Sequence, residues 1–258
     1  MPHTIDALTH DLRQEFGLTP VMAAEIECYV LLANESREVM ESFWVQVEKA
    51  FRHGGLPPLR IEKERGLHQY EIITPVMAPT ALAMTLQMIR EIVDKYARRN
   101  SVVAYFDAKP FADQPSSGMH IHLHLADHEG INAYHKPEAW MSDALRFSLG
   151  GLLAALPESM PAFFPTAADY VRLNDADHVP KIFGWGVNNR YCALRIPMTP
   201  DPYDKRIEHR VPCANADPVA VVEAVLAGVL RGLREQIEPP AQEYGKVGRD
   251  FRQMLESA

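Results

Sequence analysis

Histidines recur at every second position of the segment MHIHLHL, at His120, His122 and His124. In a β-strand, successive side chains point to opposite faces, so these three imidazoles would share one face of a strand. Imidazole binds metal ions and can also donate a hydrogen bond to phosphate. The spacing alone leaves two interpretations open, a metal or phosphate site and an ordinary strand with a wet, histidine-rich face.

Carboxylates follow the same alternating pattern elsewhere in the chain. Glu25 and Glu27 flank Ile26, so they would lie on one face of a strand. Glu64 and Glu71 are separated by RGLHQY, in which Gly66 permits a turn or bulge that could bring Glu71 beside Glu64. Taken singly, each pair is also compatible with a solvated strand.

The segment RIEHRVP adds arginines to this set. Arg206, Glu208 and Arg210 would share one face, either as an exposed ion-paired strand or as part of a site. Carboxylates that converge repel one another unless cations neutralise them, and hard divalent ions with oxygen and imidazole ligands fill that role. Together with arginines, such a set is typical of phosphoryl transfer. The chain has neither a Walker A sequence nor GxGxxG.

Composition narrows the function classes. The 258 residues are 47% hydrophobic and 23% charged, as in a soluble globular protein, and the net charge of −8 disfavours a nucleic-acid surface. Three scattered cysteines argue against a disulfide framework and against a CxxC zinc site. The N-terminus lacks the apolar core of a signal peptide, and no apolar run is long enough to span a bilayer. We therefore expect a cytoplasmic protein with no membrane partner.

The elements that must position these residues can be predicted from periodicity and turn signals. Helices are predicted at 5–16, 35–55, 80–100, 137–156 and 217–236, with a loop-rich stretch at 157–180. Strands are predicted at 23–32, 102–111, 118–125, 190–199 and 204–212, with two short extended segments around Gly66. Since no long linker or repeat divides the chain, we expect one α+β domain over residues 1–258, built on a mainly antiparallel sheet.

Five motifs stand in order along the chain: ExE, E-x-G-x-x-Q-Y-E, SGMHxH, NR-x4-R-I-P and RIExR-x-P. This ordered set resembles the catalytic domain of glutamine synthetase, from about residue 15 to about residue 235. The resemblance implies a twisted half-barrel sheet flanked by helices, and ATP with Mg²⁺ or Mn²⁺ as cofactors.

The resemblance also implies roles for particular residues. One divalent metal would be held by Glu27, Glu64 and Glu71, and a second, on the ATP phosphates, by Glu25, His120 and Glu208. The ATP-binding residues would be His122, Arg195 and Arg206, and the arginines that neutralise the transferred phosphoryl group would be Arg190, Arg195 and Arg206. Arg172 and Arg210 would bind the carboxylates of the substrate. His124 matches no functional position of the family.

The implied reaction has two steps: ATP phosphorylates a carboxylate, typically the γ-carboxylate of glutamate, and an amine then displaces phosphate to form an amide. The chain departs from the family where the amine and the acid are selected. His178 stands where a flap glutamate is usual, so we expect it to act as the base toward the amine, and Pro115–Ser116 replaces an Asn-Gly pair. Asp217 stands where Asn is usual.

These departures predict a ligase whose amine is not ammonia, or not only ammonia. Two alternatives stay open: a non-catalytic regulatory homologue that binds ATP or glutamate, and a phosphotransferase that stops at the acyl or guanidino phosphate. The family's smaller N-terminal domain has no counterpart in this sequence, so we expect a monomer or a small homo-oligomer.

Overall fold

The computed structural model describes residues 4–32, 37–175, 179–248 and 250–251. The α-helices are α1 (Ile5–Phe16), α2 (Arg37–His53), α3 (Pro79–Arg99), α4 (Asp143–Phe163) and α5 (Pro218–Glu235). Two 3₁₀ segments are η1 (Ala167–Asn174) and η2 (Pro202–Asp204). The strands are β1 (Thr19–Leu32), β2 (Arg60–Lys63), β3 (Gln69–Ile73), β4 (Val102–Tyr105), β5 (Met119–Ala126), β6 (Ile182–Val187), β7 (Cys192–Ile196) and β8 (Ile207–His209).

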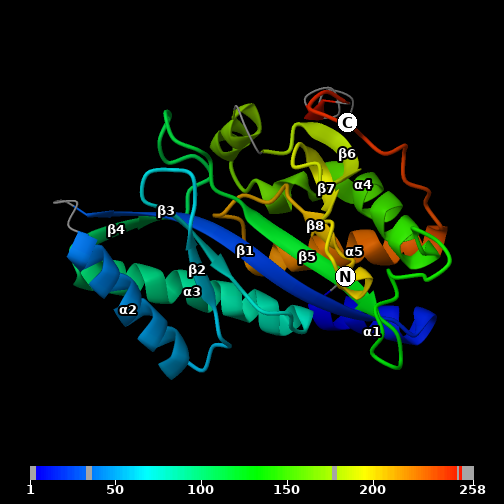
Figure 1. The fold of residues 1–258 in the computed structure, drawn as a ribbon, viewed down its shortest axis with the longest axis horizontal. Helices are drawn as coiled ribbons and strands as arrows, with labels where there is room; N and C mark the ends of the chain where they lie inside the picture. Colours follow the sequence, from blue (N-terminus) through cyan, green and yellow to red (C-terminus); the bar gives the residue numbers. More distant parts are fainter. Residues whose placement is uncertain (1–3, 33–36, 176–178, 249, 252–258) are drawn as a thin grey trace.

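All eight strands belong to one twisted sheet (Figure 1). Its order is β2-β3-β1-β5-β8-β7-β6, and β4 pairs with the far end of β1. Every pairing is antiparallel except that of β6 with β7. The end strands β2 and β6 do not pair with each other in the described part of the chain, so the sheet stays open. The predicted α+β class with a mainly antiparallel sheet is confirmed.

The helices cover one face of this sheet and leave the other face for the charged residues. α3 packs against β1, and α5 packs against α1, α3 and α4, which places these helices in a layer beside the sheet (Figure 1). Met22, Ala24 and Ile26 of β1 are fully buried, as is Ile121 of β5. Because side chains alternate along a strand, Glu25 must then point away from the helices.

Local sequence signals explain where several helices begin and end. The Thr4 hydroxyl accepts a hydrogen bond from Ala7 N at the start of α1, and Gly17 ends that helix with a positive φ of 66°. Asp217 caps α5 by accepting from Val219 N and Ala220 N, and Pro218 follows at the first helical position. Asp217 therefore has a structural role as the N-cap of α5.

The structure corrects two of the predictions. The helix expected at 137–156 runs from Asp143 to Phe163, because Ser142 supplies its N-cap and close packing on α5 carries it past Pro157 and Pro161. Part of the stretch expected to be loop at 157–180 is therefore helical, and it also contains η1. Strand β6 was not predicted, since its sequence IFGWGV contains two glycines, which are weak strand formers.

Among the described residues, no helix has the length and apolar character needed to cross a membrane.

Candidate active site

Cross-strand register brings the charged motifs together on the open face of the sheet. Glu25 of β1 lies directly opposite His120 of β5, and His122 lies opposite Glu208 of β8. Residues directly opposite each other in an antiparallel pair have side chains on the same face. The same face carries further directly paired charged positions, including Glu71 opposite Glu27 and Arg195 opposite Glu208.

Three groups of these side chains have ligand atoms within 4.8 Å of one another: Glu27, Glu64 and Glu71; Glu25, Glu71 and His120; and Glu25, His122 and Glu208. All of these residues except His122 line one cavity of about 750 Å³. The turn at Gly66 does bring Glu64 beside Glu71, as the sequence predicts. The third group places His122, where the resemblance assigns His120, beside Glu25 and Glu208.

Negative charge accumulates around Glu71. Burial, together with the negative charges of Glu25 and Glu27, raises the pKa of Glu71 to about 9. Burial also raises the pKa of Glu27 to about 7, although the charge of Arg172 and a hydrogen bond from Gly118 N (2.7 Å) act in the opposite direction. Carboxylate oxygens that repel one another in this way, with an imidazole nearby, are the donor set that a hard divalent cation such as Mg²⁺ or Mn²⁺ fits.

The carboxylates nearer β8 are compensated by protein groups. Burial acts to raise the pKa of Glu25, but hydrogen bonds with His120 and His122 outweigh burial and hold the pKa well below its usual range. Burial likewise opposes ionisation of Glu208, yet Arg210 and the neighbouring positive groups lower its pKa to about 2. For His120, burial lowers the pKa to about 4, so its imidazole is neutral at neutral pH and has a lone pair for a metal ion.

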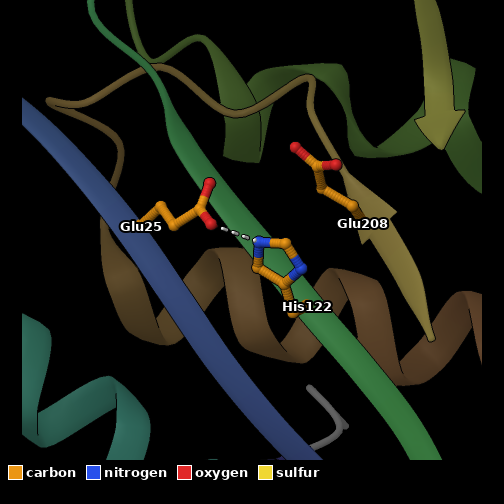
Figure 2. A group of neighbouring side chains, drawn as sticks. All are labelled: Glu25, His122 and Glu208. Carbon is orange, nitrogen blue, oxygen red and sulfur yellow. Dashed lines mark ion pairs between the residues drawn. The ribbon is translucent and has the colours of Figure 1, made fainter. Parts of the chain in front are cut away.

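His122 lies between Glu25 and Arg206. Its Nε2 is 3.1 Å from Glu25 Oε1, an ion-pair contact drawn in Figure 2. On the other side of the ring, Arg206 Nε donates to His122 Nδ1 at 3.3 Å. Because an arginine can only donate, Nδ1 is the acceptor and Nε2 carries the proton in the neutral ring. A protonated Nε2 suits an oxygen acceptor such as phosphate better than a metal ion.

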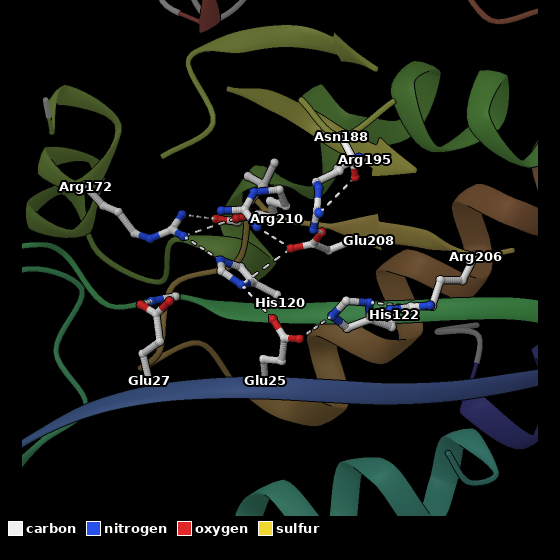
Figure 3. A network of polar contacts seen from close by, with 12 residues as sticks. Glu25, Glu27, His120, His122, Arg172, Asn188, Arg195, Arg206, Glu208 and Arg210 are labelled. Atoms are coloured by element: carbon white, nitrogen blue, oxygen red, sulfur yellow. Dashed lines mark hydrogen bonds and ion pairs between the residues drawn. The ribbon is translucent and has the colours of Figure 1, made fainter. Parts of the chain in front are cut away.

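Besides Arg206, the arginines Arg172, Arg195 and Arg210 lie on the same face, and two of them contact Glu208 (Figure 3). Arg195 Nη1 is 2.6 Å from Glu208 Oε2, while its Nη2 donates to Asn188 Oδ1 at 3.1 Å. Arg210 forms an ion pair with the other oxygen of Glu208. Arg172, only 2% exposed, donates to the backbone oxygens of Val211 and Arg210 at 3.0 and 3.2 Å.

The remaining predicted residues fall at the edges of the site. Arg190 is exposed and lines the cavity of about 750 Å³. Arg206 and His124 line a second cavity of about 570 Å³, together with Glu25, His122 and Tyr203. His124 is thus part of a cavity wall, a placement that the alternating pattern predicts but to which we assigned no role. His178 lies outside the described residues.

A family model described as "Glutamine synthetase, catalytic domain" matches residues 34–249, which is most of the chain. The chain belongs to the glutamine synthetase family. The match includes the turn with Glu64, the histidine strand β5 and the arginine segments, whereas Glu25 and Glu27 lie just before its start.

Curated relatives include a gamma-glutamylputrescine synthetase and several glutamine synthetases. Gamma-glutamylputrescine synthetase PuuA of Escherichia coli K12 is 36% identical over 155 residues, which cover 60% of this chain and 32% of that protein. The glutamine synthetase of Streptomyces viridochromogenes is 33% identical over 199 residues (75% and 42%), and that of Thermotoga maritima is 28% identical over 255 residues (88% and 56%). The chain therefore spans about a third to a half of the length of these relatives.

Solved structures support the same fold. A crystal structure of a novel glutamine synthase homolog matches with a TM-score of 0.80 at 24% identity, covering 93% of this chain and 61% of that one. A structure of the GmaS/ADP complex matches with a TM-score of 0.81 at 20% identity, covering 98% and 67%. The chain has the catalytic-domain fold of the glutamine synthetase family.

Several residues that organise the site were assigned no role in the sequence analysis. Gln69 donates to Ser116 O (3.0 Å) and Ser117 Oγ (3.3 Å) and accepts from Gly66 N (3.0 Å). Tyr29 donates to Pro115 O at 2.7 Å, and Lys109 forms an ion pair with Asp175. Only Gln69 belongs to a family motif, so its spacing was the one available signal. The others are found only when the loop of residues 106–118 is placed against β1.

Proposed function

We propose that this protein is an ATP-dependent carboxylate–amine ligase of the glutamine synthetase type. It would join the γ-carboxylate of glutamate, or of a related acid, to an amine other than ammonia, with Mg²⁺ or Mn²⁺ as cofactor. The observation that carries this proposal is that two cavities share Glu25. Carboxylates, His120 and arginines line the larger cavity, and His122 and Arg206 line the smaller one.

The second cavity supports the nucleotide half of the proposal. Its volume of about 570 Å³ and its lining of Ile73, Pro75, Val76 and Tyr203 offer an apolar surface for a nucleoside. Arg206 and His122 also line this cavity beside Glu25, and both carry N–H groups that can donate to phosphate oxygens. The similar structure of GmaS was solved with ADP, which agrees with a nucleotide site in this fold.

Glu27, Glu64 and Glu71 would hold one divalent ion, and Glu25 and Glu208, with an imidazole of β5, the other. Bound there, these ions would neutralise charge on the phosphates and on the attacking carboxylate. The arginines have a complementary task, because Arg195, Arg206 and Arg190 would stabilise the negative charge of the transferred phosphoryl group. Glu208 holds the guanidinium groups of Arg195 and Arg210 from one side, so these groups are oriented before substrate binds.

The proposed reaction balances in two steps. A γ-carboxylate oxygen bonds to the γ-phosphorus of ATP and ADP leaves, which gives an acyl phosphate. The amine nitrogen then bonds to the acyl carbon, and the bond between this carbon and the bridging oxygen breaks. Inorganic phosphate leaves with the bridging oxygen, and the nitrogen loses a proton to a base. We propose His178 as that base from its position in the sequence.

The choice of amine is supported by two sequence departures and by one relative. Pro115–Ser116 and His178 change the parts of the family that meet the amino acid and the amine, and PuuA is named a gamma-glutamylputrescine synthetase. The test is phosphate release from ATP with glutamate and a panel of ammonia, methylamine, ethylamine and putrescine. We expect an organic amine to exceed ammonia in kcat/KM by at least about tenfold.

The same assay separates the alternatives. If only ammonia supports turnover, the proposal of an organic amine is wrong, and the proposal of a ligase still stands. ADP formation without any amine would indicate a phosphotransferase, and nucleotide binding without turnover would indicate a regulatory homologue. Mass analysis of the product identifies the amide directly.

A further inference from the structure

The wall of the larger cavity contains an ion pair between Lys109 and Asp175, to which we have assigned no metal or phosphate contact. Lys109 Nζ contacts Asp175 Oδ1 and also donates to Gln114 O at 2.7 Å. The second oxygen of Asp175 accepts from Ser116 N at 2.6 Å. The two side chains are only 12% and 14% exposed, yet both line the cavity. A positive and a negative group thus stand side by side where a ligand can reach them.

This pair lies close to the carboxylate group of Glu27, Glu64 and Glu71. Ser116 is two residues before Gly118, whose N–H donates to Glu27 Oε2 at 2.7 Å. Gln69 ties the same stretch to the turn that carries Glu64. Two residues span at most about 7 Å, so the N–H groups that bind Asp175 and Glu27 are no farther apart than about one amino-acid ligand is long.

The arginines expected to bind substrate carboxylates have protein partners in this structure. Both Nη atoms of Arg172 donate to backbone oxygens, and Arg210 is paired with Glu208. An ammonium at Lys109 is a further cation on the cavity wall. Asp175 is held ionised, since hydrogen bonds from Lys109 and Ser116 outweigh burial and lower its pKa.

An ion pair removed from water gains little net stability, because desolvation offsets most of the attraction. It is, however, complementary to a zwitterion. We propose that Lys109 and Asp175 bind the α-carboxylate and the α-ammonium group of an amino-acid substrate, exchanging their mutual ion pair for one ion pair each with the ligand. This inference rests on the proposed function and names the part of the site that selects an α-amino acid over a simple dicarboxylic acid.

The test crosses two variants with three ligands. Glutamate carries both groups, glutarate lacks the ammonium, and 4-aminobutyrate lacks the α-carboxylate. Dissociation constants are measured by calorimetry with the full chain, Mg²⁺ and a non-hydrolysable ATP analogue. Lys109→Met should weaken glutamate and glutarate by at least about tenfold and leave 4-aminobutyrate within about twofold. Asp175→Asn should weaken glutamate and 4-aminobutyrate by a similar factor and leave glutarate nearly unchanged.

Matched controls are Lys136→Met and Glu48→Gln, which remove the same charges at exposed positions away from the cavity. They should leave all three constants unchanged. An equal loss for all three ligands would show that the ion pair only shapes the loop, and no loss would show that it does not meet the ligand; either result overturns the inference. If the wild-type protein binds neither glutamate nor the ATP analogue, the proposed function itself fails, and that outcome is distinct from both.

Discussion

At the scale of single residues, the open face of the sheet divides into two electrostatic halves. Around Glu208, two guanidinium groups and the strand histidines balance the carboxylates, and the pKa of Glu208 falls to about 2. Around Glu71, carboxylates meet carboxylates, and its pKa rises to about 9. The second half is therefore stable only to the extent that protons or cations neutralise it, which is the physical argument for a metal at Glu71.

Glu71→Gln is predicted to separate stability from metal binding. With a pKa of about 9, Glu71 must take up a proton when the protein folds at pH 7 without metal. The neutral amide avoids this cost, so the metal-free variant should be at least as stable as the wild type. Mn²⁺ at 100 times its dissociation constant should stabilise the wild type by about 2.7 kcal/mol, and the variant by much less. Thermal unfolding with and without Mn²⁺ measures both effects. A variant that is destabilised without metal and still responds fully to Mn²⁺ would contradict this assignment.

A pH-dependent prediction concerns Asp175. Its pKa is lowered from 3.8 in the folded protein, so its stabilising effect is present above pH 3.8 and is lost as the pH falls through the folded value. Asp175→Asn should lower the free energy of unfolding at pH 7 by about 1 to 2 kcal/mol, through loss of charged hydrogen bonds.

Urea unfolding at pH 7, 5, 4 and 3 tests this prediction. The difference between wild type and variant should be constant from pH 7 to 5 and should shrink below pH 4. The exposed control Glu48→Gln should show no such difference at pH 7. A stability difference that grows on acidification would have the wrong sign.

At the scale of elements, the strands that carry the chemistry were predictable and the connections were not. Alternation placed Glu25 with Glu27 and His120 with His122 on single faces, and the register confirms both placements. Periodicity in one segment says nothing about which strand lies beside it, so the pairing of His122 with Glu208 needed the structure. β6 was missed because its two glycines are weak strand formers. Its pairing with β7, which stabilises it as a strand, cannot be read from the segment alone.

Gln69→Leu tests how loops fix the position of Glu64. The side-chain amide joins the turn at Gly66 to Ser116 and Ser117, and Leu would leave these buried groups without that partner. We expect the free energy of unfolding to fall by about 1 to 3 kcal/mol and Mn²⁺ binding to weaken.

Gly151→Ala is the control for this variant, since it should destabilise the protein without touching the site. A methyl group there would lie 2.2 Å from Gly228 O, where α4 packs closely on α5. Calorimetric titration with Mn²⁺, at a temperature where all variants are folded, should show weaker binding only for Gln69→Leu. Equal Mn²⁺ affinity in both variants would indicate that Gln69 acts on stability alone.

At the scale of the whole molecule, the two cavities meet at the centre of the sheet. Glu25 and His120 line the larger cavity, His122 lines the smaller one, and Glu25 belongs to both. β1 and β5 therefore lie between the proposed acid site and the proposed nucleotide site, and Glu25 contacts both. The family motifs predicted a set of site residues, but not that Glu25 would line both cavities, because the smaller cavity is completed by residues of β2, β3 and η2.

This shared residue predicts a coupling between metal and nucleotide. Saturating Mn²⁺ should tighten binding of a non-hydrolysable ATP analogue by about tenfold, and the analogue should tighten Mn²⁺ binding by the same factor, since linkage is reciprocal. Glu25→Gln should reduce both factors toward one, because it weakens the metal group and the contact with His122 together. Glu64→Gln, which lies away from the smaller cavity, should weaken Mn²⁺ binding and keep most of the coupling. Calorimetry, corrected for metal–nucleotide complexes in solution, measures each factor. Coupling that survives Glu25→Gln intact would show that the two cavities communicate by another route.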